Sequence, residues 1–97
     1  MIPRSSYGTS TMPDRDKLLE RMRRSESGWR FSDLERLYLE FGFTKYEGSK
    51  HTMYIHPEFP ELRATVTRHR SLPTGYIQFA IKLIDKLKGL REEKNGG

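Results

Sequence analysis

The chain has 97 residues, with 18 lysines and arginines against 13 aspartates and glutamates, and it has no cysteine. This length allows one small domain with a thin core, and a chain without cysteine has no disulfide, thiolate metal site or cysteine nucleophile. The formal net charge of +5 favours polyanionic partners, which means nucleic acid or an anionic membrane surface.

The N-terminal third is predicted to lie outside the main domain. Residues 1–13 are rich in serine, threonine, proline and glycine, have almost nothing to bury, and are predicted to be disordered. The segment that follows favours a charged helix in which Leu18, Leu19 and Met22 form one narrow apolar stripe. Such a stripe can dock on a neighbour but does not support a free-standing helix. Residues 14–30 are therefore predicted to be an accessory helix and linker.

Residues 31–88 are predicted to form the domain, and its first element is a helix. Ser32 followed by Glu35 is typical of a capping box, and apolar side chains then recur at helical spacing. Gly42 is expected to end this helix as its C-terminal capping glycine.

Three strands and a closing helix are predicted to follow. Segments 43–47 and 51–56 are rich in aromatic and β-branched residues, and 62–68 alternates apolar with polar residues. After the turn at 72–75 apolar residues again repeat at helical spacing, and the polar segment 89–97 is expected to be a tail. Short turns make the three strands an antiparallel sheet, and both helices must cover one face to bury their stripes. The predicted fold is α+β and double-stranded-RNA-binding-domain-like, a three-stranded antiparallel sheet with two helices on one face (α-β-β-β-α) plus the N-terminal accessory helix.

Side-chain alternation predicts which residues meet at one end of this sheet. Met53 and Ile55 share a face of the second strand, and His51 lies on that same face. If the apolar faces of the second and third strands match, His51 is expected opposite Val66 or Arg68, about 5 Å away. This pairing predicts an imidazole beside a cation at the point where the buried face runs out.

Three histidines are the main candidates for chemistry. His51 begins a predicted strand, where an imidazole that titrates near neutral pH can act as a base. His69 is predicted to point to the other side of the sheet, and His56 is expected to be remote, packing on Pro57 at the far turn. No cysteine or helical histidine pair accompanies them, so no metal site and no cofactor are expected.

Four short motifs occur in order across the predicted domain. They are Phe41-Gly42-Phe43, Gly48-Ser49-Lys50-His51, His56-Pro57 and Val66-Thr67-Arg68-His69. With the predicted order of helices and strands, they resemble the HicA (YcfA-like) toxin family over roughly residues 31–88. The resemblance implies an mRNA interferase of a bacterial type II toxin–antitoxin pair, with a HicB-type antitoxin that covers the active site. It places the catalytic histidine of the family at His51, while the accessory helix lies outside the minimal family domain.

The residue types suit metal-independent cleavage of RNA. A base that removes the 2′-hydroxyl proton lets the alkoxide attack the adjacent phosphate, which produces a 2′,3′-cyclic phosphate. An imidazole such as that of His51 is matched to this proton transfer, a step typically worth about 10²–10⁴-fold. A general acid for the leaving oxygen is not evident from the sequence. The predicted RNA- and phosphate-binding residues are Gly48, Ser49, Lys50, Arg68 and His69.

The principal hypothesis is a ribosome-independent endoribonuclease toxin that binds mRNA and a HicB-type antitoxin. The free toxin is expected to be a monomer, and the antitoxin complex a hetero-oligomer. No apolar run approaches the roughly 18 residues that span a bilayer, and no apolar signal segment is evident, so a cytoplasmic protein is expected. Two alternatives stay open, namely a non-catalytic RNA-binding module of the same fold and a subunit whose basic face docks an acidic protein.

Overall fold

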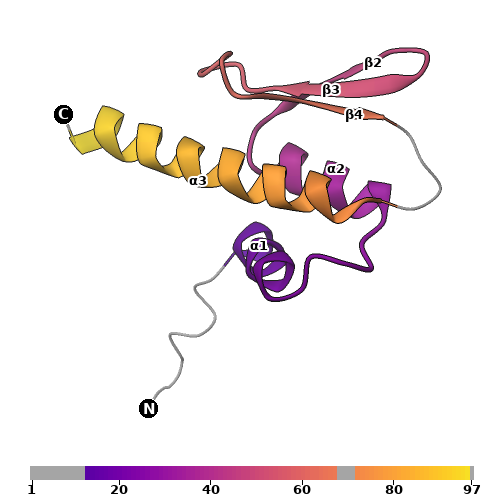
Figure 1. Ribbon diagram of the computed structural model, residues 1–97. Helices are drawn as coiled ribbons and strands as arrows, with labels where there is room; N and C mark the ends of the chain where they lie inside the picture. The colour runs from indigo at the N-terminus through magenta and orange to yellow at the C-terminus, as the bar shows by residue number, and fades with distance from the viewer. Residues whose placement is uncertain (1–12, 68–71, 97) are drawn as a thin grey trace.

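The computed structural model of the chain describes residues 13–67 and 72–96, so the segment predicted to be disordered lies, apart from Pro13, outside the described residues. In chain order the elements are α1 (Asp14–Arg24), α2 (Phe31–Glu40), β2 (Thr44–Glu47), β3 (His51–Ile55), β4 (Arg63–Thr67) and α3 (Thr74–Gly96). The fold is α+β, and α2 to α3 follow the predicted α-β-β-β-α order, preceded by α1 (Figure 1).

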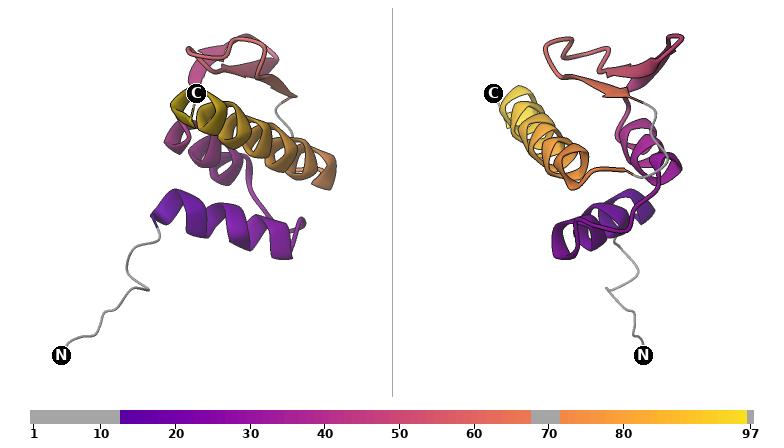
Figure 2. Two further views of the ribbon diagram at one scale, coloured as in Figure 1. Left: turned by 90° about the vertical axis from the view of Figure 1, so that its left-hand side faces the viewer. Right: turned by 45° about the vertical axis from the view of Figure 1, so that its right-hand side comes forward.

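The elements form three layers, which Figure 1 and Figure 2 show from different sides. The sheet is one outer layer, α2 and α3 lie against one of its faces, and α1 lies on the far side of these two helices. Helix α2 contacts β2, α3 contacts β4, and α1 contacts both of the other helices. None of the helices in residues 13–67 and 72–96 combines the length and the apolar composition needed to cross a bilayer. The largest fully buried apolar side chains are Leu19, Met22, Leu34, Leu37, Tyr38, Tyr54, Leu62, Ile77, Ile84 and Leu87.

Helix α2 begins earlier than the capping-box pattern predicts. The carboxylate of Asp33 accepts a hydrogen bond from the backbone N–H of Arg30 at 2.9 Å, so the helix starts at Phe31. The predicted cap at Ser32 is therefore wrong. Gly42 does end the helix, since its φ of 94° is one that glycine adopts without strain.

The sheet has the order β2-β3-β4, and both neighbouring pairs are antiparallel. In β4 the predicted apolar face is confirmed, because Ala64 and Val66 are buried. In β3 the prediction is wrong: Thr52 and Tyr54 are buried, while Met53 lies half-buried on the opposite face. The central strand thus packs Thr52 and Tyr54 against the helices, and not Met53 and Ile55 as predicted.

Tyr54 explains why β3 takes this orientation. Its ring stacks on that of buried Tyr38, with centroids 4.9 Å apart and planes inclined by 19°. Its hydroxyl donates to Oε1 of Glu35 at 2.8 Å, and Nζ of Lys45 lies 2.8 Å from the same oxygen. Burial, and then the bond to Glu35, raise the pKa of Tyr54. An aromatic ring buried with its hydroxyl satisfied contributes more than its area alone, which favours this face over the other.

Helix α1 belongs to the same core as the rest of the fold. Its predicted apolar stripe of Leu18, Leu19 and Met22 is buried in one cluster with side chains of α2, α3 and the sheet. Arg15 of α1 also lies over the ring of buried Phe41, 5.1 Å from its centroid. The segment predicted to be an accessory helix is therefore the third layer of the folded unit.

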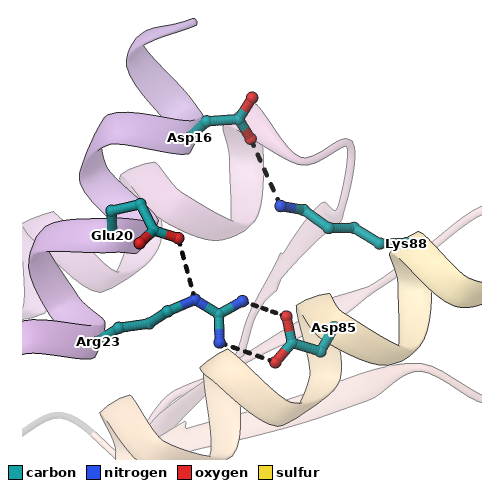
Figure 3. A network of polar contacts seen from close by, with 5 residues as sticks. All are labelled: Asp16, Glu20, Arg23, Asp85 and Lys88. Carbon is teal, nitrogen blue, oxygen red and sulfur yellow. Dashed lines mark hydrogen bonds and ion pairs between the residues drawn. The ribbon is translucent and has the colours of Figure 1, made fainter. Parts of the chain in front are cut away.

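Five charged side chains join α1 to α3 (Figure 3). Arg23 of α1 donates two hydrogen bonds to the carboxylate of Asp85 in α3, one of them 3.0 Å long, and this bonding raises the pKa of Arg23. Glu20 lies 3.2 Å from Nε of Arg23, and Lys88 lies 3.7 Å from Asp16. Exposed pairs typically contribute about 0.2–1 kcal/mol each, so the network orients α1 while the apolar stripe holds it.

Helix α3 extends further than the apolar pattern predicts. The segment 89–97, predicted to be a polar tail, is helical as far as Gly96. Arg91 and Lys94 in this part of α3 lie 3.7 Å and 3.2 Å from carboxylate oxygens of Glu58, in the turn between β3 and β4. The end of α3 therefore holds this turn.

Candidate active site

The motif of residues 48–51 forms the tight turn between β2 and β3. The N–H of Gly48 donates to the backbone carbonyl of His51 at 2.9 Å and closes the turn. A Cβ at position 48 would lie 3.0 Å from that carbonyl oxygen, so a larger residue fits only if the backbone shifts. Gly48, Ser49, Lys50 and His51 are all exposed. The turn thus presents four of the predicted site residues to solvent at one end of the sheet.

On the hypothesis that His51 is the base for RNA cleavage, Gly48→Ala is expected to lower cleavage by up to about tenfold, because displacement of a catalytic group by roughly 1 Å costs up to about 10²-fold and the added Cβ causes a smaller shift. The added Cβ presses on the carbonyl of His51 and moves the residue that carries the imidazole. Cleavage rate and thermal unfolding of the variant measure the effect. The matched control is Gly89→Ala in α3, where a Cβ meets no atom within 4 Å. Unchanged cleavage by Gly48→Ala would show that the tight turn does not position His51.

His51 lies on the sheet face that points away from the helices. The next residue, Thr52, is buried against the helices, and strand alternation puts His51 on the opposite side. Its cross-strand partner is Thr67, so the predicted pairing with Val66 or Arg68 is wrong. The error follows from the reversed orientation of β3, because Val66 pairs with buried Thr52 instead. His51 is therefore a surface residue of the outer sheet face.

Two predicted site residues follow β4 directly in the chain. Arg68 and His69 lie outside the described residues, so the structure gives neither a place beside His51. Their predicted phosphate-binding roles stay predictions. Within the described residues, Lys50 is the predicted phosphate-binding cation, and it is exposed next to His51 in the chain.

The outer face carries an aromatic residue that the sequence reasoning missed. Tyr46 of β2 pairs with Met53, so it lies on the same face as His51, and 53% of its surface is exposed. It precedes Gly48 by two residues, which makes it a diagonal neighbour of His51 at roughly 7–8 Å. An exposed ring at this distance can stack on a base. Strand alternation counted back from Gly48 could have identified Tyr46 as a neighbour of His51. Its exposure could be predicted only once the orientation of β3 was known.

His56 is a buried structural residue at the opposite end of β3. Only 1% of its surface is exposed, and its Nδ1 accepts a hydrogen bond from the N–H of Glu58 at 3.1 Å. The rings of Phe43 and Phe59 lie against it, with centroids at 5.1 Å and 5.5 Å. Nη2 of Arg91 is 3.4 Å from its Nε2. Burial, and then the charge of Arg91, lower the pKa of His56, so the neutral ring is the form that fits here.

The free energy of unfolding is expected to fall as the pH drops from 7 towards 5. The unfolded chain takes up a proton at His56 near its ordinary pKa of about 6.5, whereas burial in the folded chain lowers the pKa. Above the unfolded pKa of about 6.5, His56 is neutral in both states and its full contribution to stability is present. As the pH falls from there towards the lower pKa of the folded chain, this contribution is progressively lost. One proton limits the slope to about 1.4 kcal/mol per pH unit. Denaturant unfolding at several pH values should show this slope, and His56→Gln should flatten it; an equal slope in both proteins contradicts the assignment.

Within residues 13–67 and 72–96, no cluster of three or more metal-ligating side chains is found.

Comparisons with protein-family models, with curated proteins and with solved structures found no match for this chain. The resemblance to the HicA family therefore rests on the four ordered motifs together with the order of helices and strands. Of those motifs, the structure puts residues 48–51 in an exposed turn and His56 in the core.

Proposed function

We propose that the chain is a metal-independent endoribonuclease, the toxin of a type II toxin–antitoxin pair, with His51 as general base. The observation that carries the proposal is the position of His51, exposed on the outer sheet face and fixed through its carbonyl by Gly48. His51 thereby differs from His56, whose imidazole is enclosed in the core. The motif resemblance and the basic charge of the chain support the same function.

In the proposed reaction the imidazole of His51 takes the proton of a ribose 2′-hydroxyl. The resulting alkoxide attacks the adjacent phosphorus, the bond to the 5′-oxygen breaks, and that oxygen leaves with a proton from solvent or from His69. Negative charge builds on the phosphate oxygens, where a cation and a hydroxyl donor lower the barrier. Lys50 and Ser49 are exposed and directly precede His51 in the chain, and we assign these two roles to them, while Arg68 keeps its predicted role as a second cation.

The outer face around His51 supports binding of a single RNA strand. The ring of Tyr46 offers a stacking surface for a base, an interaction typically worth about 1–3 kcal/mol. The formal charge of +5 favours the phosphate backbone. The proposed natural inhibitor is a HicB-type antitoxin that covers His51, in a hetero-oligomer formed in the cytoplasm.

Cleavage is expected to persist in EDTA and to stop when the RNA carries a 2′-deoxyribose at the cleaved position. The first result follows because the proposed reaction uses only side chains, and the second because the nucleophile is the 2′-hydroxyl. Gel analysis of a short RNA, its singly 2′-deoxy-substituted form and the matching DNA provides both measurements. Cleavage of the substituted RNA contradicts the mechanism. Salt-dependent binding of all-ribose RNA without any cleavage would instead support the RNA-binding module.

A further inference from the structure

Among the described strands, β4 lies at one end of the sheet and has no strand beside it on the side away from β3. The N–H of Thr67 donates to the hydroxyl of Tyr76 at 3.4 Å, so it points away from β3 and towards α3. Every second residue of an antiparallel strand has this orientation, so the N–H and C=O of Arg63 and Thr65 also point outwards. In the part of the chain that the structure describes, these outward groups have no hydrogen-bond partner. Unpaired edge amides are a template for a further strand.

An apolar groove of about 630 Å³ runs beside this open edge. Arg63 and Thr65 line one side, and Tyr76 and Phe79 from the first turns of α3 line the other. Phe79 is 47% exposed and gives this wall of the groove an accessible aromatic surface. Tyr76 closes one end of the edge because its hydroxyl already takes the N–H of Thr67. The groove therefore has room for a short strand alongside the first half of β4.

Unpaired amides and an exposed apolar wall together fit one mode of recognition. A peptide laid along β4 would exchange backbone hydrogen bonds with Arg63 and Thr65, and its alternate side chains would enter the groove over Phe79. The main-chain bonds would supply affinity, and the groove would select an apolar residue at one position.

The charges around the groove indicate which kind of segment it takes. Arg63 is the only charged residue among the described residues that line it, and exposed Lys82 lies one helical turn beyond Phe79 in α3. A second copy paired at this edge would bring another Arg63 close to the first, on a chain whose total net charge is also +5. Repulsion between like charges opposes such self-pairing and favours an acidic partner.

We propose that the β4 edge and its groove bind an extended acidic segment of a partner protein by strand addition, with an apolar side chain of that segment over Phe79. This surface lies on the edge of the sheet, whereas His51 lies on its outer face beside the β2–β3 turn. The inference does not rest on RNA cleavage.

Fluorescence anisotropy with a labelled eight-residue peptide tests the inference. In the peptide, glutamate alternates with apolar or β-branched residues, namely threonine, leucine and phenylalanine. Its binding is expected to weaken at least tenfold in the Thr65→Pro variant. Proline at 65 removes an outward N–H but none of the bonds to β3, a position where an edge strand tolerates it. Phe79→Ala is expected to weaken binding similarly. Leu39→Ala, which truncates a 43% exposed side chain of α2, is the matched control and should bind normally.

Backbone pairing is tested directly by N-methylation of the peptide. Methyl groups on the amides of one alternate set should abolish binding, and methyl groups on the other set should leave it intact, because only one set faces β4. His51→Ala should bind the peptide as tightly as the unmodified chain. Equal binding of both methylated peptides, or no binding at millimolar peptide, overturns the proposal. The proposal is also overturned if the chain forms dimers on its own and Thr65→Pro abolishes them. The occupant of the β4 edge would then be a second copy of the chain.

Discussion

His51→Ala is expected to abolish RNA cleavage, with a fall in rate of about 10²–10⁴-fold or more. The imidazole is exposed on the outer sheet face, so its removal leaves no cavity and no buried polar group unpaired. Alanine keeps the backbone carbonyl that accepts the hydrogen bond from Gly48, so the turn should persist. The free energy of unfolding should therefore change by less than about 0.5 kcal/mol. Rates of RNA fragment formation and denaturant unfolding measure the two effects, and growth arrest on expression should disappear.

The matched control is Thr44→Ala, at an exposed position of β2 on the same sheet face. This variant removes a side chain of similar exposure but no group that can act as a base, so cleavage should be unchanged. Full activity of His51→Ala would exclude His51 as the base. A loss of activity that accompanies a large loss of stability would assign His51 a structural role instead.

Leu19→Ala is expected to lower the free energy of unfolding by about 2–5 kcal/mol. Leu19 is fully buried between α1 and the other two helices, in the cluster that also holds Met22. The total free energy of unfolding of a small domain is about 5–15 kcal/mol, so this loss is a large fraction of the stability. Chemical denaturation with far-UV circular dichroism gives the measurement.

Lys17→Ala is the matched control for Leu19→Ala, since it truncates an exposed side chain of the same helix. Its free energy of unfolding should change by no more than about 0.5 kcal/mol. If Leu19→Ala costs less than about 1 kcal/mol, α1 is a detachable addition and not the third layer of the core. The outcome thus decides whether packing of α1 contributes to the stability of the whole folded unit.

The order of elements was predictable from the sequence because helical spacing, glycine stops and strand alternation are local signals. The orientation of β3 was not, because His51, Met53 and Ile55 form as apolar a face as Thr52 and Tyr54 do. Tertiary contacts decide between the two faces: Tyr54 gains a stacked ring and a hydrogen-bond partner from α2. Its burial puts His51 on the outer face.

The candidate site shows the same division between local and tertiary information. The exposed turn at 48–51 was predictable, since glycine and serine mark it and the motif names His51. Tyr46 was missed because its face follows from the orientation of β3. The burial of His56 was missed because Phe43 and Arg91 reach it from distant parts of the chain. A polar C-terminal segment gives no local signal of such contacts.

The chemical identity of the RNA ends tests the central claim most directly. Mass spectrometry of fragments produced by the purified chain in EDTA should find a 2′,3′-cyclic phosphate on each upstream fragment and a 5′-hydroxyl on each downstream fragment. The same reaction with His51→Ala should leave the RNA intact. Fragments with 3′-hydroxyl and 5′-phosphate ends, or cyclic-phosphate ends formed equally by His51→Ala, would contradict the proposed mechanism.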